Sequence, residues 1–401
     1  MFTRTGRATL LFMAFLSAPF IRAQQQETDE QALIEVKDGI SISKDSLFLL
    51  NLRFRMQNRL GFTTVSGEDL SADIVDARVR RLRLRLDGFV LNRDLRYYIQ
   101  LNFSRNDLDL ESGTVAQPVR DAMVYYHFNR QVYIGFGQSK LPGNRQRVIS
   151  SGNLQFADRS IANAAYTLDR DFGAFAYWTI PMATQQVQVK GAFTTGDGRG
   201  ALPGTTGMAY TGRVEWLPLG VFTKQGDYSE GDLEFEPLPK LSVAATYSHN
   251  DRATRTGGQL GAELYSPRDI NTFIADMMFK YKGWAMLGEF FDRTSETPIT
   301  ANAEGQTRAV NVGRALSTQV SKIFPSKYEF ALRYSLLDTD AEAMGTTIDR
   351  IEEFLLGSTK YLNGHRIKLQ LYVGYRWLER RMDLDAGGNA WTTLFQVEFG
   401  I

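Results

Sequence analysis

The chain has 401 residues, and its 46 Lys and Arg nearly cancel its 45 Asp and Glu, so the formal net charge is +1. This balance argues against a nucleic-acid-binding protein, and any electrostatic preference must therefore be local. Cysteine is absent, which excludes disulfide bonds, Cys-ligated zinc and thiol catalysis. The mean hydropathy is −0.27, and no segment reaches the roughly 18 apolar residues of a membrane-spanning helix.

The N-terminus has the features of a secretory signal peptide. Two arginines precede a mostly apolar stretch, residues 8–21, and Ala23 supplies a small residue before a cleavage site. A membrane anchor is the alternative, but the apolar stretch is short for one. We therefore predict a signal peptide over residues 1–23 and an exported protein. Residues 24–45 are polar and acidic, which predicts a flexible periplasmic lead-in.

After the lead-in, apolar and polar residues alternate with a period of two, which is the spacing of a β-strand with two unlike faces. The pattern begins in residues 47–62, and a polar loop is predicted over 63–77. It returns in residues 78–104, RVRRLRLRLDGFVLNRDLRYYIQLNFS, where two alternating runs flank a short turn at 91–94. This segment predicts a β-hairpin. One face of the hairpin is aliphatic and aromatic, and the other carries a row of arginines.

The same pattern recurs to the C-terminus, with short turns and long polar loops in alternation. After a strand that ends at residue 128, the candidate strands are residues 132–138, 172–179, 186–195, 210–217, 241–250, 271–281, 284–293, 310–322, 328–337, 352–361, 366–377 and 391–401. Together with the earlier strands they number 16. The stretch 218–240 is long and acidic where a short turn is expected, and we predict an enlarged periplasmic turn there.

These patterns predict an all-β fold: a single antiparallel transmembrane β-barrel of about 16 strands over residues 46–401. Bacterial barrels have an even number of strands, short periplasmic turns and longer outer loops. Aromatic residues beside the short turns, such as Trp178, Trp216 and Trp284, fit the interfacial girdle of such barrels. The alternative, core aromatics of a soluble β-sandwich, does not explain why they gather at one type of turn. The expected location is the outer membrane.

In a barrel of this size the interior is an aqueous channel, so function depends on lumen-facing side chains. The strand register assigns 14 cations and seven carboxylates to the lumen. The cations are Arg53, Arg55, Arg59, Arg81, Arg83, Arg85, Arg96, Lys190, Arg213, Lys280, Arg293, Arg333, Lys368 and Arg376. The acidic residues are Asp87, Asp121, Glu215, Asp276, Glu289, Glu329 and Glu398. The interior is therefore expected to be electropositive and to favour anions.

The strongest local feature is the wall formed by the first three strands. Its arginines are the predicted pore-lining residues: Arg53, Arg55, Arg59, Arg81, Arg83, Arg85 and Arg96. Like charges that face each other across strands destabilise a sheet unless they are compensated. Two hypotheses remain open. The arginines form a track for anions, since guanidinium groups bind phosphate or carboxylate through two parallel bonds, or they are neutralised by carboxylates from an inward loop or the opposite wall.

Several segments, spread over most of the chain after the signal peptide, resemble the phosphate-selective porin O and P family. They are RRLRLRLDGFVLNRDLRYYIQL (80–101), VYIGFGQSKLPGNRQRVISSGNLQFADRS (132–160), RDFG (170–173), YTGRVEWLPLG (210–220), YEFALRYSLLD (328–338) and LNGHRIKLQLYVGYRW (362–377). The resemblance implies a 16-stranded porin, general or anion-preferring, that is usually trimeric and has a loop folded into the pore. The phosphate-binding positions of the family are not matched residue by residue, so substrate choice is not carried over.

The segment 139–171 lacks alternation, and a structureless segment of this length is uncommon unless it is functional. It follows the fifth strand, where porins place the loop that folds into the lumen. We predict that it is an inward loop that forms the constriction, with Lys140, Arg145, Arg147 and Arg159 as its basic residues. The alternative is an external loop that packs on a neighbour in a trimer.

Other chemistry has little support in the sequence. The three histidines lie far apart and predict no metal site, and no Gly-x-Ser-x-Gly motif is present. We therefore expect no enzyme and no cofactor. The favoured function is an outer-membrane porin for passive diffusion of small hydrophilic solutes. It is expected to prefer anions, phosphate among the candidates, and its partners are the lipid bilayer, small anions and two further copies in a homotrimer.

Two other functions compete with the porin. The first is a structural or accessory barrel of an outer-membrane assembly, with its lumen occluded by the long loop. The second is a barrel hydrolase in the outer membrane, which would need a nucleophile and a base close together, and the register places none.

Overall fold

The computed structural model describes residues 33–36, 39–104, 117–201, 204, 207–345, 348–380 and 388–401. The predicted signal peptide and the first part of the predicted lead-in lie outside these residues. No helix in the described ranges is long and apolar enough to cross a membrane.

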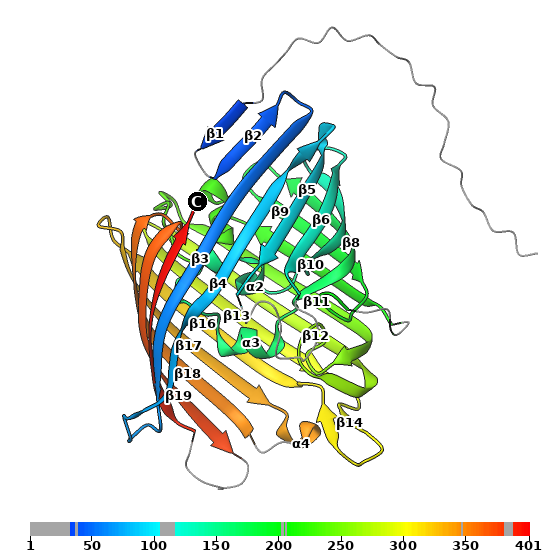
Figure 1. Ribbon diagram of the computed structural model, residues 1–401, viewed down its shortest axis with the longest axis vertical. Coiled ribbons are helices and arrows are strands. Elements are labelled where there is room, and N and C mark those ends of the chain that lie inside the picture. The colour runs from blue at the N-terminus through cyan, green and yellow to red at the C-terminus, as the bar shows by residue number, and fades with distance from the viewer. Residues whose placement is uncertain are drawn as a thin grey trace, which may run out of the picture.

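Sixteen antiparallel strands close into a β-barrel (Figure 1). The main sheet has 18 strands, of which β1 and β2 form an extension and the other 16 form the barrel. Each barrel strand pairs with the next barrel strand along the chain, and the last pairs with the first to close the ring. They are β3 (Phe48–Thr64), β4 (Ala72–Val90), β5 (Asn92–Asn102), β6 (Val119–His127), β7 (Val132–Lys140), β8 (Arg170–Pro181), β9 (Gln186–Thr194), β10 (Ala209–Leu217), β11 (Lys240–Arg255), β12 (Glu263–Tyr281), β13 (Trp284–Thr294), β16 (Gly313–Ile323), β17 (Tyr328–Thr339), β18 (Ile348–Asn363), β19 (Ile367–Arg380) and β20 (Ala390–Gly400). The predicted fold is confirmed.

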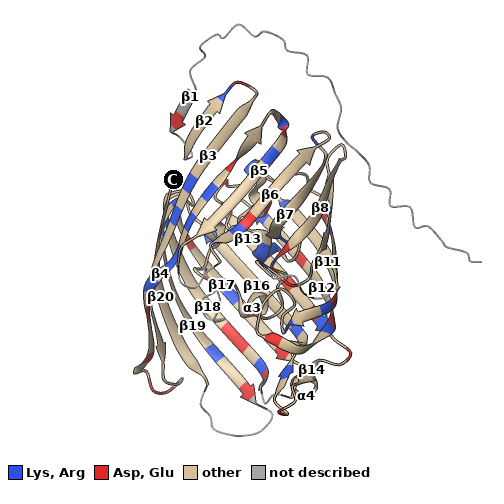
Figure 2. Ribbon diagram, turned by 45° about the vertical axis from the view of Figure 1, so that its right-hand side comes forward, with Lys and Arg blue, Asp and Glu red and all other residues tan. Residues whose placement is uncertain are grey.

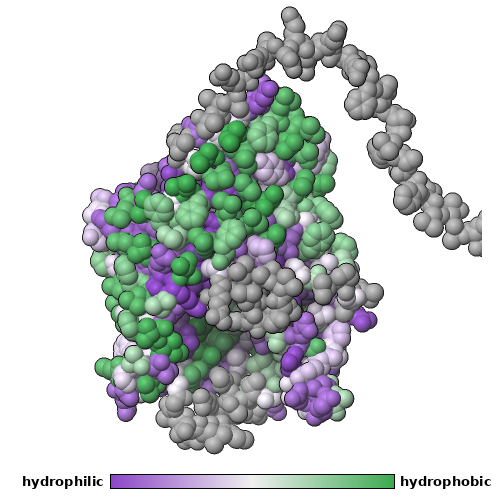
Figure 3. Space-filling view, in the orientation of Figure 1, coloured by the Kyte–Doolittle hydropathy of each residue, from purple (hydrophilic) through white to green (hydrophobic). Residues whose placement is uncertain are grey.

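The alternation of residue types decides which side of the wall each side chain faces. In β10, Arg213 and Glu215 point inward and are 1% and 0% exposed. Tyr210, Val214 and Trp216 point outward and are 52%, 48% and 46% exposed. The outer wall is therefore largely hydrophobic, as Figure 3 shows, and it suits contact with lipid.

The predicted loop 63–77 is too long, because β4 begins at Ala72. The register between β3 and β4 shifts near the middle of the pair: Gln57 lies opposite Arg81, and Asn58 lies opposite Val79. Arg80 is therefore an extra residue, a β-bulge, which moves the outward-facing set by one position. The bulge interrupts the alternation in the sequence and hides the first part of the strand.

Part of the predicted lead-in is a β-hairpin rather than a flexible segment. β1 (Leu33–Val36) pairs with β2 (Ile40–Lys44), and β2 pairs with β3. The contact begins at Leu52 of β3, just beyond Arg55, where pairing between β20 and β3 ends. The hairpin thus covers the edge of β3 that β20 leaves unpaired, and unpaired strand edges are sites of aggregation.

The two ends of the barrel differ. Short turns join β4 to β5, β12 to β13 and β16 to β17 at one end, where the N-terminal hairpin and the C-terminus also lie (top of Figure 1). The opposite end carries longer connections, which include β14 (Ile299–Ala301), β15 (Thr307–Ala309) and α4 (Ala341–Met344). This arrangement matches the predicted alternation of short turns and long loops.

The connection between β7 and β8, residues 141–169, folds into the barrel, and we call it the inward segment. Its apolar side chains pack on lumen-facing side chains: Phe156 contacts Tyr372, and Ile149 clusters with Met278. The hydrophobic core therefore lies inside the barrel, between this segment and the wall. The segment contains α2 (Arg145–Val148), η2 (Ser151–Asn153) and α3 (Ile161–Tyr166).

The connection between β10 and β11, residues 218–240, also enters the lumen, and we call it the β10–β11 segment. It contains η3 (Thr223–Tyr228) and is the enlarged turn expected at this position. Its inward course was not predicted. Glu230 accepts hydrogen bonds from Gln146 and Gln155 of the inward segment, at 3.0 and 2.7 Å. The two segments therefore meet inside the barrel.

Candidate functional site

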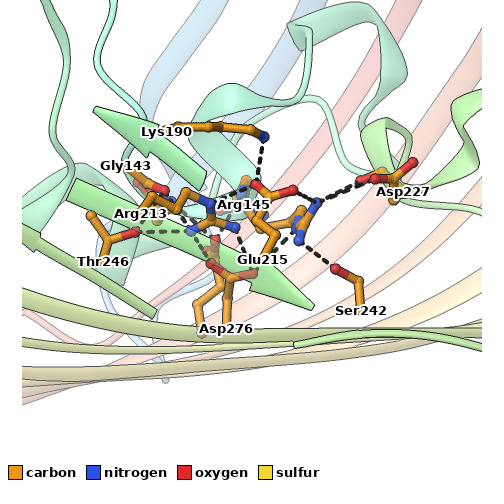
Figure 4. A network of polar contacts seen from close by, with 12 residues as sticks. Gly143, Arg145, Lys190, Arg213, Glu215, Asp227, Ser242, Thr246 and Asp276 are labelled. Atoms are coloured by element: carbon orange, nitrogen blue, oxygen red, sulfur yellow. Dashed lines mark hydrogen bonds and ion pairs between the residues drawn. The ribbon is translucent and has the colours of Figure 1, made fainter. Parts of the chain in front are cut away.

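Carboxylates of the lumen lie beneath the inward segment, and Arg145 of α2 is inserted among them (Figure 4). Its guanidinium nitrogens lie 3.2 Å from Asp276, 3.6 Å from Glu215 and 3.9 Å from Asp227. Burial alone would lower the pKa of Arg145, but the carboxylates of Glu215 and Asp276 outweigh it and raise the pKa above its ordinary value. Loss of one partner from such a buried pair costs about 3–5 kcal/mol, so Arg145 fixes the position of the segment.

Cations of the barrel wall hold the backbones of the two in-folded segments. Arg213 of β10 donates to the Gly143 carbonyl at 2.7 Å and to Asp276 at 2.6 Å. Lys280, Arg293, Arg333 and Lys368 act in the same way, donating to the carbonyl oxygens of Gly226, Tyr166, Asp158 and Gly152, respectively. These side chains face the lumen, as the register indicated, but they anchor the segments instead of bordering open space.

A cavity of 580 Å³ lies between the inward segment and the wall formed by the first barrel strands. Figure 2 shows Lys and Arg recurring along β3 and β4 on this side. Of the described residues that line the cavity, ten are cationic and one, Asp121, is acidic. Both Asp121 oxygens bind Arg170, at 2.9 and 3.0 Å. The cations are Arg53, Arg55, Arg83, Arg85, Arg120, Lys140, Arg147, Arg159, Arg170 and Arg366.

Two of the predicted pore-lining arginines are neutralised by the inward segment and do not line this cavity. Arg59 and Arg81 are 7% and 4% exposed, and both contact Asp158, at 2.8 and 3.8 Å. Burial would raise the pKa of Asp158, but Arg59 above all, with Arg80 and Arg81, holds it well below its usual range. For this pair, the hypothesis of neutralisation by a loop carboxylate describes the geometry.

The other predicted arginines have different surroundings. Arg55 lies 3.1 Å from Glu398 and donates to Ser150, and a Cβ on Gly152 would meet its guanidinium carbon at 2.1 Å, so glycine permits this close approach. Arg85 lies 2.8 Å from Asp87 of its own strand.

Arg83 donates to the Ser151 hydroxyl at 2.9 Å. Arg53 lines the cavity and forms no ion pair with any other described residue. Arg96, in contrast to the prediction, does not line it. It lies exposed near the short turn, where it donates to the Arg93 carbonyl.

Three of the four basic residues predicted for the constriction border the cavity. Lys140 donates to the carbonyls of Val148 and Ile149, Arg159 donates to the carbonyls of Gln146 and Ile149, and Arg147 pairs with Asp169. Burial, followed by the nearby Arg147 and Arg83, lowers the pKa of Arg159 to about 9. The neighbouring arginines thus add to the effect of burial, and Glu230 opposes it. Arg145 is the exception, because it points away from the cavity into the acidic wall.

The β10–β11 segment is the functional element that the sequence analysis missed. Its Tyr228 borders the cavity, and its Asp227 and Glu230 bind the inward segment. The composition held a signal for this contact: residues 218–240 are acidic and residues 139–171 are basic, which suggests that the two segments attract each other. In the described ranges, no group of three or more His, Asp or Glu has the geometry of a metal site.

Residues 51–238 match the family model of the phosphate-selective porins O and P, which confirms the resemblance in this part of the chain; the segments 328–338 and 362–377 lie outside the match. No curated protein matches the chain. Solved structures with the same fold include an anion-selective porin from Comamonas acidovorans (12% identity, TM-score 0.53, 88% of this chain and 100% of that chain) and the outer-membrane channel DcaP of Acinetobacter baumannii (11%, 0.54, 90% and 99%). A trimer form of OmpT from Vibrio cholerae also matches (8%, 0.53, 88% and 100%). The family match supports an outer-membrane porin, and the solved structures share the barrel fold.

Proposed function

We propose that this outer-membrane porin passes small hydrophilic solutes by passive diffusion and prefers anions. The observation that carries the proposal is the cavity lined by ten cationic residues and one acidic residue. A lumen lined by one sign of charge concentrates ions of the opposite sign and sets the selectivity of a pore. The near-neutral composition of the chain does not oppose this, because selectivity depends only on the charges that the solute meets.

The arrangement of the inward segment supplies the physical reason for the preference. Glu215, Asp276, Glu289 and Glu398 are on the lumen side of the wall, yet each is at most 4% exposed, because the two in-folded segments cover them. The opposite wall keeps Arg53, Arg83 and Arg85 on the cavity. The segments thus cover carboxylates more completely than they cover arginines, and the remaining open space is positive.

Phosphate is among the anions that this surface suits. Guanidinium groups bind phosphate or carboxylate in a planar, two-bond geometry and stay charged at every physiological pH. The constriction is formed by the inward segment with Lys140, Arg147 and Arg159, and a homotrimer is the proposed assembly. The family match supports the porin assignment, and the trimer form of OmpT shows that a barrel of this fold can assemble in this way.

An occluded accessory barrel is the second candidate, since two segments occupy the lumen and their central side chains are buried. Single-channel recording in planar bilayers with unequal KCl concentrations separates the two. A porin gives discrete conductance steps, and anion preference gives a reversal potential of the sign set by chloride. Silent membranes would support the occluded barrel, and a potential of the opposite sign would reject the anion preference.

The inward segment as the constriction has its own test. Deletion of residues 143–152 removes α2 and the backbone that Arg213 and Lys368 hold, so single-channel conductance is expected to rise. Unchanged conductance in a correctly folded barrel would show that the constriction lies elsewhere.

A further inference from the structure

A second cavity, of 760 Å³, adjoins the arginine-lined one and has a different chemistry. Three residues, Lys140, Val148 and Tyr228, border both cavities and therefore lie between them. Both volumes fall in the range of about 300–1,000 Å³ that is typical of small-molecule sites. The second cavity lies beside the turn that precedes β9, since Gln186 and Gln188 are among its lining residues.

Aromatic rings form one side of the second cavity. Tyr133 of β7 stacks on Tyr177 of β8, with ring centroids 4.4 Å apart and an interplanar angle of 12°. His127 of β6 stacks on the other face of Tyr133 at 4.5 Å. The three rings brace one another across three neighbouring strands, so the position of the tyrosine hydroxyl groups is fixed before any solute arrives.

The polar groups of this cavity have hydrogen-bonding capacity that the protein does not use. The side chains of Tyr133, Tyr177, Gln186 and Gln188 form no hydrogen bond with other described residues. Tyrosine hydroxyls and glutamine amides both donate and accept hydrogen bonds, as the hydroxyls of a sugar do. Because His127 and Tyr177 cover both faces of Tyr133, that ring presents its edge and its hydroxyl to the cavity. Inorganic phosphate needs none of these groups.

Lys140 lies between the arginine-lined cavity and the second cavity. Its ammonium group has three donors, and two of them bind the carbonyls of Val148 and Ile149 at 3.1 and 3.2 Å. One donor is left for a solute at the boundary. Tyr228 of the β10–β11 segment also borders both cavities, and its hydroxyl contacts Glu215 of β10 at 3.2 Å.

We propose that the two cavities together bind anionic sugars: a sugar ring that carries a phosphate or a carboxylate. The anionic group lies among the arginines and at Lys140, and the ring lies against Tyr133 and Tyr177 with its hydroxyls at Gln186 and Gln188. The proposal rests on the anion preference proposed above and adds the class of solute. Tyr177 and Gln188 are specificity-determining residues, because they meet the part of the solute that inorganic phosphate lacks.

The test is block of the ion current in planar bilayers containing the full-length protein, with glucose 6-phosphate, inorganic phosphate, cyclohexyl phosphate and glucose as probes at pH 8. Glucose 6-phosphate and cyclohexyl phosphate are then close to doubly charged, because the second pKa of a phosphate ester is about 6, and inorganic phosphate is mostly doubly charged as well. Glucose 6-phosphate is expected to block at a concentration about tenfold below that of inorganic phosphate. Cyclohexyl phosphate, a ring without hydroxyls, and glucose, a sugar without charge, are expected to block more weakly than glucose 6-phosphate. The same test for a carboxylate compares glucuronate with acetate, and glucuronate is expected to block at the lower concentration.

Variants locate the sugar site. Tyr177→Leu and Gln188→Leu are each expected to raise the half-blocking concentration of glucose 6-phosphate severalfold while leaving that of inorganic phosphate unchanged. Tyr126→Leu, on the lipid-facing side of β6, is the control that changes neither. Equal block by glucose 6-phosphate and inorganic phosphate, or by glucose 6-phosphate and cyclohexyl phosphate, in the wild type would overturn the proposal, whether or not the variants fold. If the block is equal but the reversal potential still shows a preference for chloride, only the anionic-sugar proposal fails. If the reversal potential shows a preference for cations, the proposed anion preference fails, and the anionic-sugar proposal fails with it.

Discussion

Replacement of Arg145 by Met is the sharpest perturbation of the inward segment. Arg145 is fully buried and lies between Asp276 and Glu215, 3.2 and 3.6 Å away. Removal of one member of a buried ion pair costs about 3–5 kcal/mol; here Glu215 and Asp276 would lose part of their compensation and keep their contacts with Arg213. At 1.4 kcal/mol per factor of ten, a cost of this size changes the equilibrium ratio of bound to released inward segment by a factor of about 10² to 4 × 10³.

Single-channel recording detects the release. In Arg145→Met, the open-channel current is expected to become larger and noisier, and the anion preference is expected to fall as Glu215 and Asp276 become accessible to ions. Arg147→Met is the matched control: the same substitution two residues away in α2, on a side chain that is 13% exposed and borders the cavity. It should lower the anion preference without added noise. Wild-type current and selectivity in Arg145→Met would refute the assignment of Arg145 as the anchor.

Three further predictions concern the arginine wall. Asp158→Asn removes a negative charge beside Arg59 and Arg81, so the reversal potential is expected to shift further toward that of chloride; a shift the other way would show that this charge does not act on the lumen. Because the pKa of Asp158 is depressed, its stabilising contact is fully present above the usual value of 3.8 and is lost only as the pH falls through the lower folded-state pKa. Selectivity measured from pH 7 to about 4.5 should therefore stay constant as far as this contact is concerned, and a loss near pH 5 would contradict the pairing. Arg53→Gln is expected to lower the chloride-to-potassium permeability ratio, whereas Arg130→Gln, in a short turn, should leave it unchanged; equal effects would mean that the cavity does not set selectivity.

The sequence was sufficient for the barrel, because period-two alternation is a local property. The pleat of a single strand turns Leu82, Leu84 and Leu86 toward lipid and turns the arginines between them toward water. The same rule failed at Arg80, where a bulge shifts the faces by one residue. It also failed for residues 33–36, because a strand of four residues is too short to show a period of two.

The functional side of the molecule was only partly predictable. The side of the wall on which each charge lies follows from register, so the lumen-facing cations and carboxylates were identified. The positions of the two in-folded segments decide whether a lumen-facing cation contacts solute or pairs with a carboxylate. These segments are irregular, so no periodicity in the sequence predicts their positions. Asp158 is the clearest case, since one loop carboxylate neutralises Arg59 and Arg81 and leaves Arg53 on the cavity.

The central claim is that the water-accessible lumen is cationic because its carboxylates are covered. Labelling of the folded protein in detergent with a water-soluble carbodiimide and an amine, followed by mass spectrometry, measures which carboxylates water can reach. Glu215, Asp276, Glu289 and Glu398 are expected to stay unlabelled until the protein is denatured, while Asp338, whose side chain is 50% exposed, reacts at once. Rapid labelling of the first four in the folded barrel would contradict the claim.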